Sequence, residues 1–241
     1  DARMVREVAV PAHRGMILDR RGEPLAVSAP VVSLWANPQV LGEDLEHAKN
    51  IAQSLGLPEA EFIERVVRLK NKEFMYLKRH VNPAEAETVL ANKWQGVHGT
   101  EEFHRYYPAA EVATHLVGFN NIDDQGQEGM ELAYESWLQG TSGKKVVQKD
   151  RTGRTVKDLQ LLSTAQPGKD LNLSIDLRMQ YVAYRELKAV VQQHKASSGS
   201  AVVLDVQTGE ILAMVNQPAY NPNNRAVMSI DSLRNRALTD V

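Results

Sequence analysis

The chain has 241 residues, of which 43% are hydrophobic, with 28 basic and 30 acidic side chains and no cysteine. At roughly 150 residues per domain this length predicts about one and a half domains, and the hydrophobic content excludes an intrinsically disordered chain. A net charge of −2 and the lack of cysteine exclude a globally basic nucleic-acid binder, disulfides, thiolate–zinc sites and a cysteine nucleophile.

The first 36 residues predict extended structure. Residues 16–18 form the core of one strand, and the glycine at position 22 suits a turn into the next extended segment. Residues 31–35 predict a further strand, which Asn37 and Pro38 stop. No uncharged apolar run in the sequence reaches the roughly 18 residues that a membrane-spanning helix needs.

A small α+β module is predicted between residues 44 and 92. Asp44 is placed to cap its first helix, and Gly56 closes that helix. The core-facing residues of this helix are Leu45, Ala48, Ile51, Ala52 and Leu55. Pro58 fits the first turn of a second helix, and Pro83, after Asn82, fits that of a third. Residues 74–77 predict a strand between them.

A stripe of apolar residues predicts one core-facing helix over residues 127–139. The stripe consists of Met130, Ala133, Tyr134, Trp137 and Leu138. Residues 140–157 are rich in Lys, Arg and Gly around an apolar pair, Val146 and Val147. They predict an exposed hairpin with a turn at Thr152 and Gly153.

A turn at residues 166–168 marks a predicted domain boundary. Beyond it, residues 171–175 predict a strand, and Asp176 caps a long helix. The residues expected to point inward from this helix are Leu177, Tyr181, Tyr184, Leu187 and Val191. Residues 201–206 and 211–215 predict a hairpin whose continuous apolarity indicates that both faces are covered. These last 70 or so residues are too few for the layered core that they begin.

No stretch of the sequence predicts an active site. Ser142 and Lys145 have the spacing of a serine nucleophile and its activating lysine, but the glycines around them predict a solvated, protonated amine. Residues 151–153 are similar to a Lys-Thr-Gly string, but they lie too close to Ser142 and no Ser-x-Asn string accompanies them, so a turn glycine beside a surface arginine is the interpretation. Neither segment is therefore assigned a catalytic role.

Metal and nucleic-acid sites are predicted to be absent. His98 and His104 are six positions apart and lack the close pairing of metal ligands, and no cofactor is predicted. The basic stretch 65–80 contains Phe74 and Tyr76, as a nucleic-acid site could. Neighbouring glutamates favour a polar helix face instead.

Three clusters of charged, aromatic and glycine residues have a different character. The first contains Arg14, Gly15, Asp19, Arg20, Gly22 and Glu23; the second contains Arg105, Tyr107 and Pro108 and leads into residues 114–118; the third contains Gly126, Glu128, Gly129 and Glu131. Arginines and carboxylates beside turn glycines are what an ion-paired junction between distant strands needs. The clusters therefore indicate architecture and not catalysis.

These three motifs, in this order, resemble the N-terminal non-catalytic module of the class B penicillin-binding proteins. The strings at 173–176, 200–205, 209–214 and 220–223 are similar to the start of the transpeptidase domain of that family. Residues 234–241 resemble the stretch before the catalytic Ser-x-x-Lys in its division-specific branch. One departure is Ala110, where the family usually has glycine, so this turn is not expected to need a positive φ.

The resemblance implies an α+β fold class. It implies an elongated mixed β pedestal over residues 1–168, with a helical insert at about 44–92. The first strand, helix and hairpin of an α/β transpeptidase domain would follow over residues 169–241. The abrupt ends at Asp1 and Val241 agree with a chain cut from a longer protein.

The resemblance also implies a reaction. In this family a serine attacks the penultimate D-Ala of a peptidoglycan stem peptide, releases the terminal D-Ala and passes the acyl group to a neighbouring amine. β-Lactams acylate the same serine. The motifs for this chemistry would all lie after Val241, so no catalytic residue is carried onto this chain, which alone is expected to be inactive.

The pedestal of this family stands on the periplasmic side of the inner membrane, between a membrane anchor and the catalytic domain. Its implied partners are the division glycosyltransferase and other division proteins, with no nucleic acid. Two alternatives remain open: an elongation-specific member of the family, and a stand-alone interaction module without enzyme activity.

Overall fold

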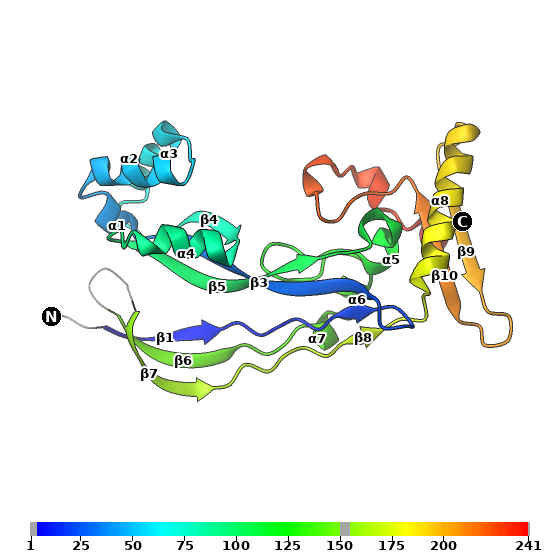
Figure 1. The fold of residues 1–241 in the computed structure, drawn as a ribbon, viewed down its shortest axis with the longest axis horizontal. Helices are drawn as coiled ribbons and strands as arrows, with labels where there is room; N and C mark the ends of the chain where they lie inside the picture. Colours follow the sequence, from blue (N-terminus) through cyan, green and yellow to red (C-terminus); the bar gives the residue numbers. More distant parts are fainter. Residues whose placement is uncertain (1–3, 150–154, 241) are drawn as a thin grey trace. The chain divides into compact units, whose positions relative to one another are not determined.

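The computed structural model describes residues 4–149 and 155–240, which form a mixed fold of helices and strands (Figure 1). The chain divides into two compact units, each assembled from segments that are far apart in the sequence. Unit 1 comprises residues 1–11, 30–104 and 142–165, and unit 2 comprises residues 12–29, 105–141 and 166–241. Across the described ranges, no helix combines the length and apolarity needed to cross a bilayer.

One sheet of unit 1 is antiparallel and has the strand order β1–β6–β7 (Figure 1). β1 spans Met4–Val10, β6 Gly143–Lys149 and β7 Thr155–Ser163. β6 and β7 are the strands expected of the hairpin, with Val147 buried, and β1 adds a third strand beside β6. The turn expected at Thr152 and Gly153 falls on residues 150–154, outside the described residues.

The larger core of unit 1 lies between helices and a second group of strands. β3 (Pro24–Ala36) pairs with β4 (Met75–Val81) and with β5 (Val97–Tyr106). The helices are α1 (Pro38–Leu41), α2 (Leu45–Ser54), α3 (Glu59–Arg68) and α4 (Pro83–Ala91). Leu34, Ile51, Phe62 and Val66 are among the residues that these elements bury together.

Side-chain caps start two of these helices at the positions that the sequence indicates. Asp44 accepts a hydrogen bond from the His47 backbone N–H at 3.0 Å, and Asn82 accepts one from Ala84 at 2.9 Å. Pro58 is the residue before the first turn of α3, one position earlier than expected. A proline fits there as well, because the first N–H groups of a helix have no partner within the helix.

Two strands of unit 2, β2 (Ile17–Leu18) and β8 (Leu171–Asn172), have only two residues each. β2 pairs antiparallel with the start of β3 and parallel with β8. Gly22 takes a φ of 83° in the turn between β2 and β3. Around them lie η1 (Ala110–Val112), α5 (Thr114–Val117), α6 (Gly129–Ala133) and α7 (Glu135–Leu138).

The single helix expected over residues 127–139 is instead two short helices, α6 and α7. The break is at Tyr134, whose φ of −112° and ψ of 27° are not helical. Leu138 is fully buried, but the Trp137 side chain is 45% exposed. The buried position in α6 is the charged Glu131, so an ion-pair requirement overrides the apolar stripe.

The turn after Tyr107 also differs from expectation. Ala110 has a φ of 45°, in the left-handed region where glycine is favoured. Its backbone N–H donates to the Tyr107 carbonyl at 2.9 Å, closing the turn that begins η1. The turn therefore keeps a positive φ without the glycine, and the expectation of an ordinary φ was wrong.

The last part of unit 2 pairs α8 (Leu177–Gln193) with a hairpin of β9 (Gly199–Leu204) and β10 (Ile211–Gln217). It ends with η2 (Arg225–Val227), η3 (Ile230–Leu233) and α9 (Arg236–Thr239). Asp176 caps α8 as expected, and β8 is shorter than the strand expected over 171–175. Tyr184 of α8 is buried, but Tyr181 is 52% exposed because the buried face passes through Gln180 instead.

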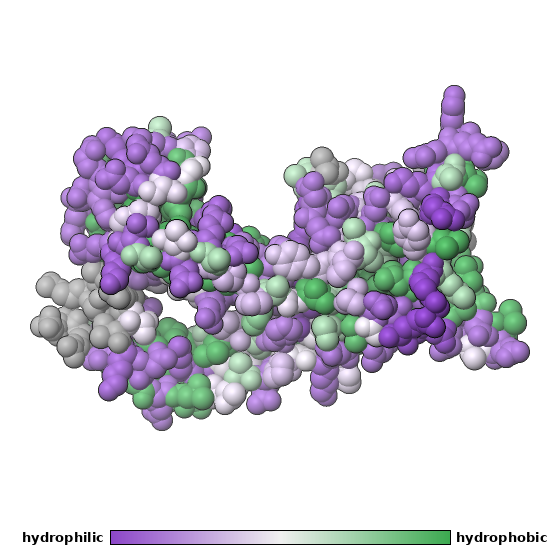
Figure 2. All heavy atoms as spheres, in the orientation of Figure 1, coloured by the Kyte–Doolittle hydropathy of each residue, from purple (hydrophilic) through white to green (hydrophobic). Residues whose placement is uncertain are grey.

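Burial of the hairpin is also uneven, contrary to the expectation that both faces are covered. Most of β10 is buried against α8, whereas Val202, Val203 and Leu204 of β9 are exposed. Figure 2 shows the hydrophobic atoms that gather over this hairpin. The helix covers one strand more completely than the other.

Candidate functional site: a buried charge network in unit 2

Arg14 lies fully inside unit 2, at the start of the first sequence motif. Its Nε donates to Glu131 Oε2 at 2.8 Å, and its Nη2 donates to Glu135 Oε2 at 2.6 Å. Two backbone carbonyls complete the site: Nη1 donates to Asp124 O at 3.1 Å and Nη2 to Glu131 O at 3.0 Å. Because a buried guanidinium must be paired and hydrogen-bonded, these four contacts account for its burial.

Arg105, from the second motif, reaches the same carboxylate. Its Nε donates to Glu131 Oε1 at 2.7 Å, and its Nη1 donates to Ser28 Oγ at 3.0 Å. The Arg105 and Glu131 side chains are both inaccessible to solvent. One carboxylate from the third motif therefore joins the arginines of the first two.

The charges of this network are balanced. Burial alone would lower the pKa of Arg14, but the hydrogen bond and charge of Glu135 and the charge of Glu131 outweigh it, so the pKa lies above its ordinary value. Nearby, burial raises the pKa of Asp124, which receives a hydrogen bond from Asn120 Nδ2 at 2.6 Å. The positive charges of Arg14 and Arg105 are thus matched by the negative charges of Glu131 and Glu135.

Tyr107 ties the second motif to the downstream string at 220–223. Its backbone N–H donates to Asn223 Oδ1 at 3.0 Å, and Asn223 Nδ2 donates back to the Tyr107 carbonyl at 2.9 Å. The phenol hydrogen-bonds Asn120, and burial, followed by the charge of Glu131, raises the pKa of Tyr107 far above its ordinary range. Pro108, next in the motif, is exposed.

Asp19 of the first motif connects the β2–β3 turn to the long helix α8. Its Oδ1 accepts from the backbone N–H groups of Arg21 and Glu23 at 2.7 and 2.8 Å, and its Oδ2 accepts from Leu177 N at 3.0 Å. Leu177 is the first residue of α8, where a carboxylate is favoured by the helix dipole. The exposed Arg20 contributes its backbone N–H, which donates to Ile175 O at 2.9 Å.

The motif glycines lie where the backbones approach closely. A Cβ on Gly15 would lie 2.0 Å from Lys169 O, and one on Gly126 would lie 2.1 Å from Glu131 O. Gly129 has a φ of 58° and packs against Gly118. A larger residue at Gly126 would displace the backbone that carries Glu131. Glu128, between these glycines, is exposed.

Among the predicted site residues, the structure therefore brings Arg14, Arg105 and Glu131 into direct contact. Asp19, Gly15 and Gly22 lie in the turns that lead away from them. Sequence reasoning missed Glu135 and Asp124. Glu135 lies four positions after Glu131, a spacing that places two residues on one helical face and could have revealed it.

Arg14, Arg105 and Glu131 are buried and joined by ion pairs, so the centre of the network is closed to solvent and its charged groups serve one another. Within residues 4–149 and 155–240, no group of three or more potential ligands could hold a metal ion. Lys145 forms an ion pair with Asp158 at 3.1 Å on a strand, away from any helical Ser-x-x-Lys arrangement. Residues 151–153 fall outside the described ranges. What the network can do is fix the backbone of unit 2.

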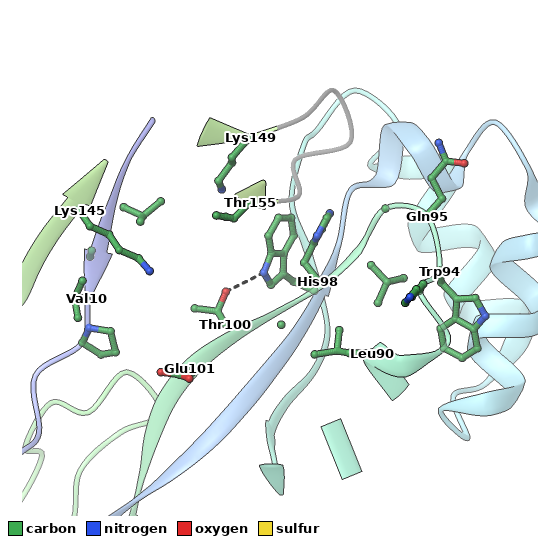
Figure 3. A pocket seen from close by; sticks show the side chains of 18 residues that line it. Val10, Leu90, Trp94, Gln95, His98, Thr100, Glu101, Lys145, Lys149 and Thr155 are labelled. Carbon is green, nitrogen blue, oxygen red and sulfur yellow. Dashed lines mark hydrogen bonds between the residues drawn. The ribbon is translucent and has the colours of Figure 1, made fainter. Parts of the chain in front are cut away.

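A groove of about 720 Å³ lies within unit 1, between residues 8–11 and residues 97–101. Figure 3 shows Val10 and Lys145 on one side of it, with His98 and Thr100 behind. Trp35 Nε1 donates to Thr100 Oγ1 at 2.9 Å, and the Trp35 and His98 rings are 4.4 Å apart.

The rim of this groove is basic. Lys93, Lys145 and Lys149 line it, and among the described lining residues Glu101 supplies the only carboxylate. Lys149 Nζ lies 5.7 Å from the centre of the Trp35 ring, and burial, together with the charge of Arg6, lowers the pKa of Lys149. The groove thus combines aromatic and aliphatic walls with positive charge.

Two protein-family models match the chain. The penicillin-binding protein dimerisation domain matches residues 9–173, and the penicillin-binding protein transpeptidase domain matches residues 199–241. This chain belongs to the class B penicillin-binding proteins.

Curated penicillin-binding proteins are similar to it over its whole length. The peptidoglycan D,D-transpeptidase FtsI of Escherichia coli is 44% identical over 246 residues, and the probable peptidoglycan D,D-transpeptidase PbpC of Pseudomonas aeruginosa is 43% identical over 240 residues. Both alignments cover 100% of this chain and 42% of the relative. The chain therefore spans less than half the length of these proteins.

Solved structures of penicillin-binding proteins share the fold. Penicillin-binding protein 2X from Streptococcus thermophilus has a TM-score of 0.65 over 97% of this chain and 37% of its own, at 23% identity. Penicillin-binding protein 2 from Helicobacter pylori, solved in complex with MreC, has a TM-score of 0.67 over 98% of this chain and 47% of its own, also at 23% identity.

Proposed function

We propose that this chain supplies the pedestal and the first part of the catalytic domain of a septal peptidoglycan D,D-transpeptidase, a β-lactam target. The supporting observation is the 44% identity to FtsI across the whole chain. The dimerisation-domain model matches first and the transpeptidase-domain model second, which is the order of the proposed pedestal and catalytic part. We place the pedestal at residues 1–168, its helical insert at about 44–92, and the transpeptidase part at 169–241. The protein would stand on the periplasmic side of the inner membrane.

In this proposal the pedestal motifs have a structural role. Arg14, Arg105 and Glu131 fix the backbone of unit 2, and Asp19 fixes the start of α8 through the Leu177 N–H. The nucleophilic serine, its lysine and the other catalytic motifs would follow Val241 in a longer polypeptide. The chain alone would then bind no substrate covalently.

Fluorescent penicillin tests the catalytic part of the proposal. We expect the 241-residue chain to take no label, and a form extended by the complete transpeptidase domain to be labelled at one serine. Labelling of the short chain that Ser142→Ala abolishes would place the nucleophile at Ser142 and refute the assignment. An extended form that takes no label would refute the transpeptidase function.

We further propose that the groove of unit 1 binds an acidic segment of a division protein. The three lysines on its rim and the wall formed by Trp35 and His98 support this choice. In a pull-down with purified division proteins, Lys149→Glu should reduce capture severalfold. Lys157→Glu makes the same charge change outside the groove and serves as the control. Equal loss in both variants would argue against the groove.

The elongation-specific alternative makes a different prediction. A fluorescent fusion of the full-length protein should concentrate at the division site if the septal assignment is right. A distribution along the lateral wall, with binding to elongation proteins only, would favour the alternative. If the 241-residue chain binds division proteins but the full-length protein takes no penicillin label, the protein would be an interaction module without enzyme activity.

A further inference from the structure

Polar contacts are the main attachment of the last described segment of unit 2, beside the packing of Leu233 against the apolar core. This segment contains η3 and α9, each only four residues long. Its apolar side chains Ile230 and Leu238 are 87% and 66% exposed. The buried residues are Ser232 and Arg236, and a segment with such a composition gains little from the hydrophobic effect.

Asn216 is the centre of these polar contacts. Its side chain is buried in β10, where Oδ1 accepts from Ala237 N at 2.7 Å and from Ser200 Oγ at 2.7 Å. Its Nδ2 donates to Asn235 Oδ1 at 2.8 Å. One amide therefore joins β9, β10 and the start of α9, and uses three of its four hydrogen-bonding positions.

Arg236 holds the other side of the segment. Its Nη2 donates to Asp231 Oδ1 at 2.7 Å, its Nη1 donates to Asp231 O at 2.9 Å, and its Nε lies 3.5 Å from Asp240 Oδ2. These contacts are internal to residues 231–240. Asn216 therefore supplies two hydrogen bonds that join this segment to the sheet, beside a 3.6 Å contact of Asn235 Nδ2 with Met214 Sδ. The Ser232 carbonyl is held separately, by His115 Nε2 at 2.7 Å.

We propose that Asn216 is a positioning residue for acyl transfer, and that it acts by fixing the segment 235–239 to β10. The inference rests on the proposed function, in which the nucleophilic serine follows this segment. In that function residues 234–241 lead to the catalytic motif, so a shift of α9 would displace the serine. Asn216 would thus act through α9 and not by contact with the substrate.

The reaction affected is the first chemical step with a β-lactam. The serine Oγ–C bond forms, the lactam C–N bond breaks, and the serine proton is transferred to the lactam nitrogen. Binding of the lactam before this step depends on the pocket walls, whereas the chemical step depends on the position of the nucleophile. A misplacement of about 1 Å can slow such a step by up to about a hundredfold.

The test uses the full-length protein and separates the acylation rate constant from the dissociation constant of the non-covalent complex. Asn216→Ala should lower the acylation rate constant roughly tenfold to a hundredfold while the dissociation constant stays within about twofold. Asn235→Ala removes the amide partner of Asn216 and the Asn235 contact with Met214 Sδ, both of which join the segment to β10, and should lower the rate constant in the same direction. If Asn216→Ala does not fold, the acylation rate constant of Asn235→Ala decides the outcome.

Ser200→Ala is the matched control, because it removes one hydrogen bond from Asn216 and leaves both bonds to the segment 235–237. We expect its acylation rate constant to stay within about twofold of the wild-type value. An unchanged rate constant in the two asparagine variants, or an equal loss in Ser200→Ala, would overturn the inference. A wild-type protein that is not acylated would instead refute the proposed function on which it rests.

Discussion

Glu131 places its two carboxylate oxygens in a site with no exposed surface, where each meets a different guanidinium. Both arginines come from other parts of the chain, 117 and 26 positions away. The free energy of a buried pair is modest when it is intact, because desolvation opposes the Coulomb attraction. It is the loss of one partner that is costly, since the remaining charge is then buried alone.

The first prediction concerns this carboxylate. Glu131→Gln should lower the free energy of unfolding by about 3–5 kcal/mol, because two buried arginines lose their shared counter-charge. Urea denaturation followed by circular dichroism measures it. Glu128→Gln makes the same change at an exposed position and should remain within about 0.5 kcal/mol of the wild type. A Glu131→Gln variant as stable as this control would contradict the role of the network.

The second prediction concerns Ala110, whose φ of 45° is unfavourable for any residue with a Cβ. Ala110→Gly should raise the free energy of unfolding by about 0.5–1 kcal/mol, since relief of left-handed strain exceeds the added entropy of the unfolded chain. Its neighbour Ala109 has an ordinary φ of −76°, so Ala109→Gly should be neutral or destabilising. Thermal melting of both variants decides the sign.

At the scale of single residues, the sequence indicated three members of the buried charge network. Arg14, Arg105 and Glu131 were singled out because arginines, carboxylates and turn glycines recur together. An ion-paired junction was expected, but which carboxylate each arginine meets could not be predicted, because the contacts are tertiary and join residues 26 and 117 positions apart. Tyr181 and Trp137 were wrongly placed inside for the same reason: buried polar groups, Gln180 and Glu131, occupy the inward positions.

At the scale of elements, α8 begins at two carboxylates from different parts of the chain. Asp176 caps it locally and accepts from Arg178 N at 3.0 Å, while Asp19 reaches Leu177 N from the β2–β3 turn. Hydrogen bonding to Arg178 lowers the pKa of Asp176 to about 2. The helix is thus anchored at its N-terminus to the shortest strands of unit 2.

The third prediction concerns this anchor. Asp19→Ala should destabilise the protein by about 1–3 kcal/mol, because three backbone N–H groups lose their acceptor. Hydrogen exchange should accelerate at Leu177 and in the turn that contains Arg21 and Glu23. Asp205→Ala removes a similar local acceptor from the β9–β10 turn and should leave exchange at Leu177 unchanged. If Asp19→Ala shows no faster exchange at Leu177, the anchor is not significant.

Helix starts were the elements that the sequence predicted best, because Asp44, Asn82 and Asp176 cap through local chemistry. Helix continuity was predicted less well. The apolar stripe over residues 127–139 has the right spacing for one helix, but the chain turns at Tyr134 so that Glu135 can also reach Arg14. A local pattern does not contain this requirement.

At the scale of the whole molecule, stability should depend on pH through His115. Its ring is buried in α5, Nε2 lies 2.7 Å from the Ser232 carbonyl, and Arg236 is a nearby positive charge. Burial, and then Arg236, lowers the pKa of His115 below its ordinary value. The unfolded chain therefore binds more protons than the folded one once the pH falls below about 6.5.

The fourth prediction follows from this difference. Stabilisation by His115 is fully present above pH 6.5 and is lost as the pH falls through the lower pKa of the folded state. The melting temperature should fall from pH 7.5 to pH 5.5, and more steeply for the wild type than for His115→Gln. His194→Gln, at the C-terminal end of α8, is the control substitution and should keep the wild-type slope. Parallel curves for the wild type and His115→Gln would contradict the assignment.

The two compact units follow a different division from the boundary expected near residue 168, which stays a prediction. The chain passes between these units at residues 11–12, 29–30, 104–105, 141–142 and 165–166. Composition and turn residues indicate where one helix or strand ends and the next begins. They do not indicate which distant segments of the chain share a core.

This interleaving has a genetic consequence. A gene that encodes a unit as one continuous block can be moved, duplicated or fused to another gene by a single recombination event. Here no single crossover point excises either unit, because each is encoded in three separate stretches. The segment 37–96, which carries α1 to α4 and β4, lies by contrast within one stretch of unit 1. A change of gene structure could therefore reach this segment without dividing either unit.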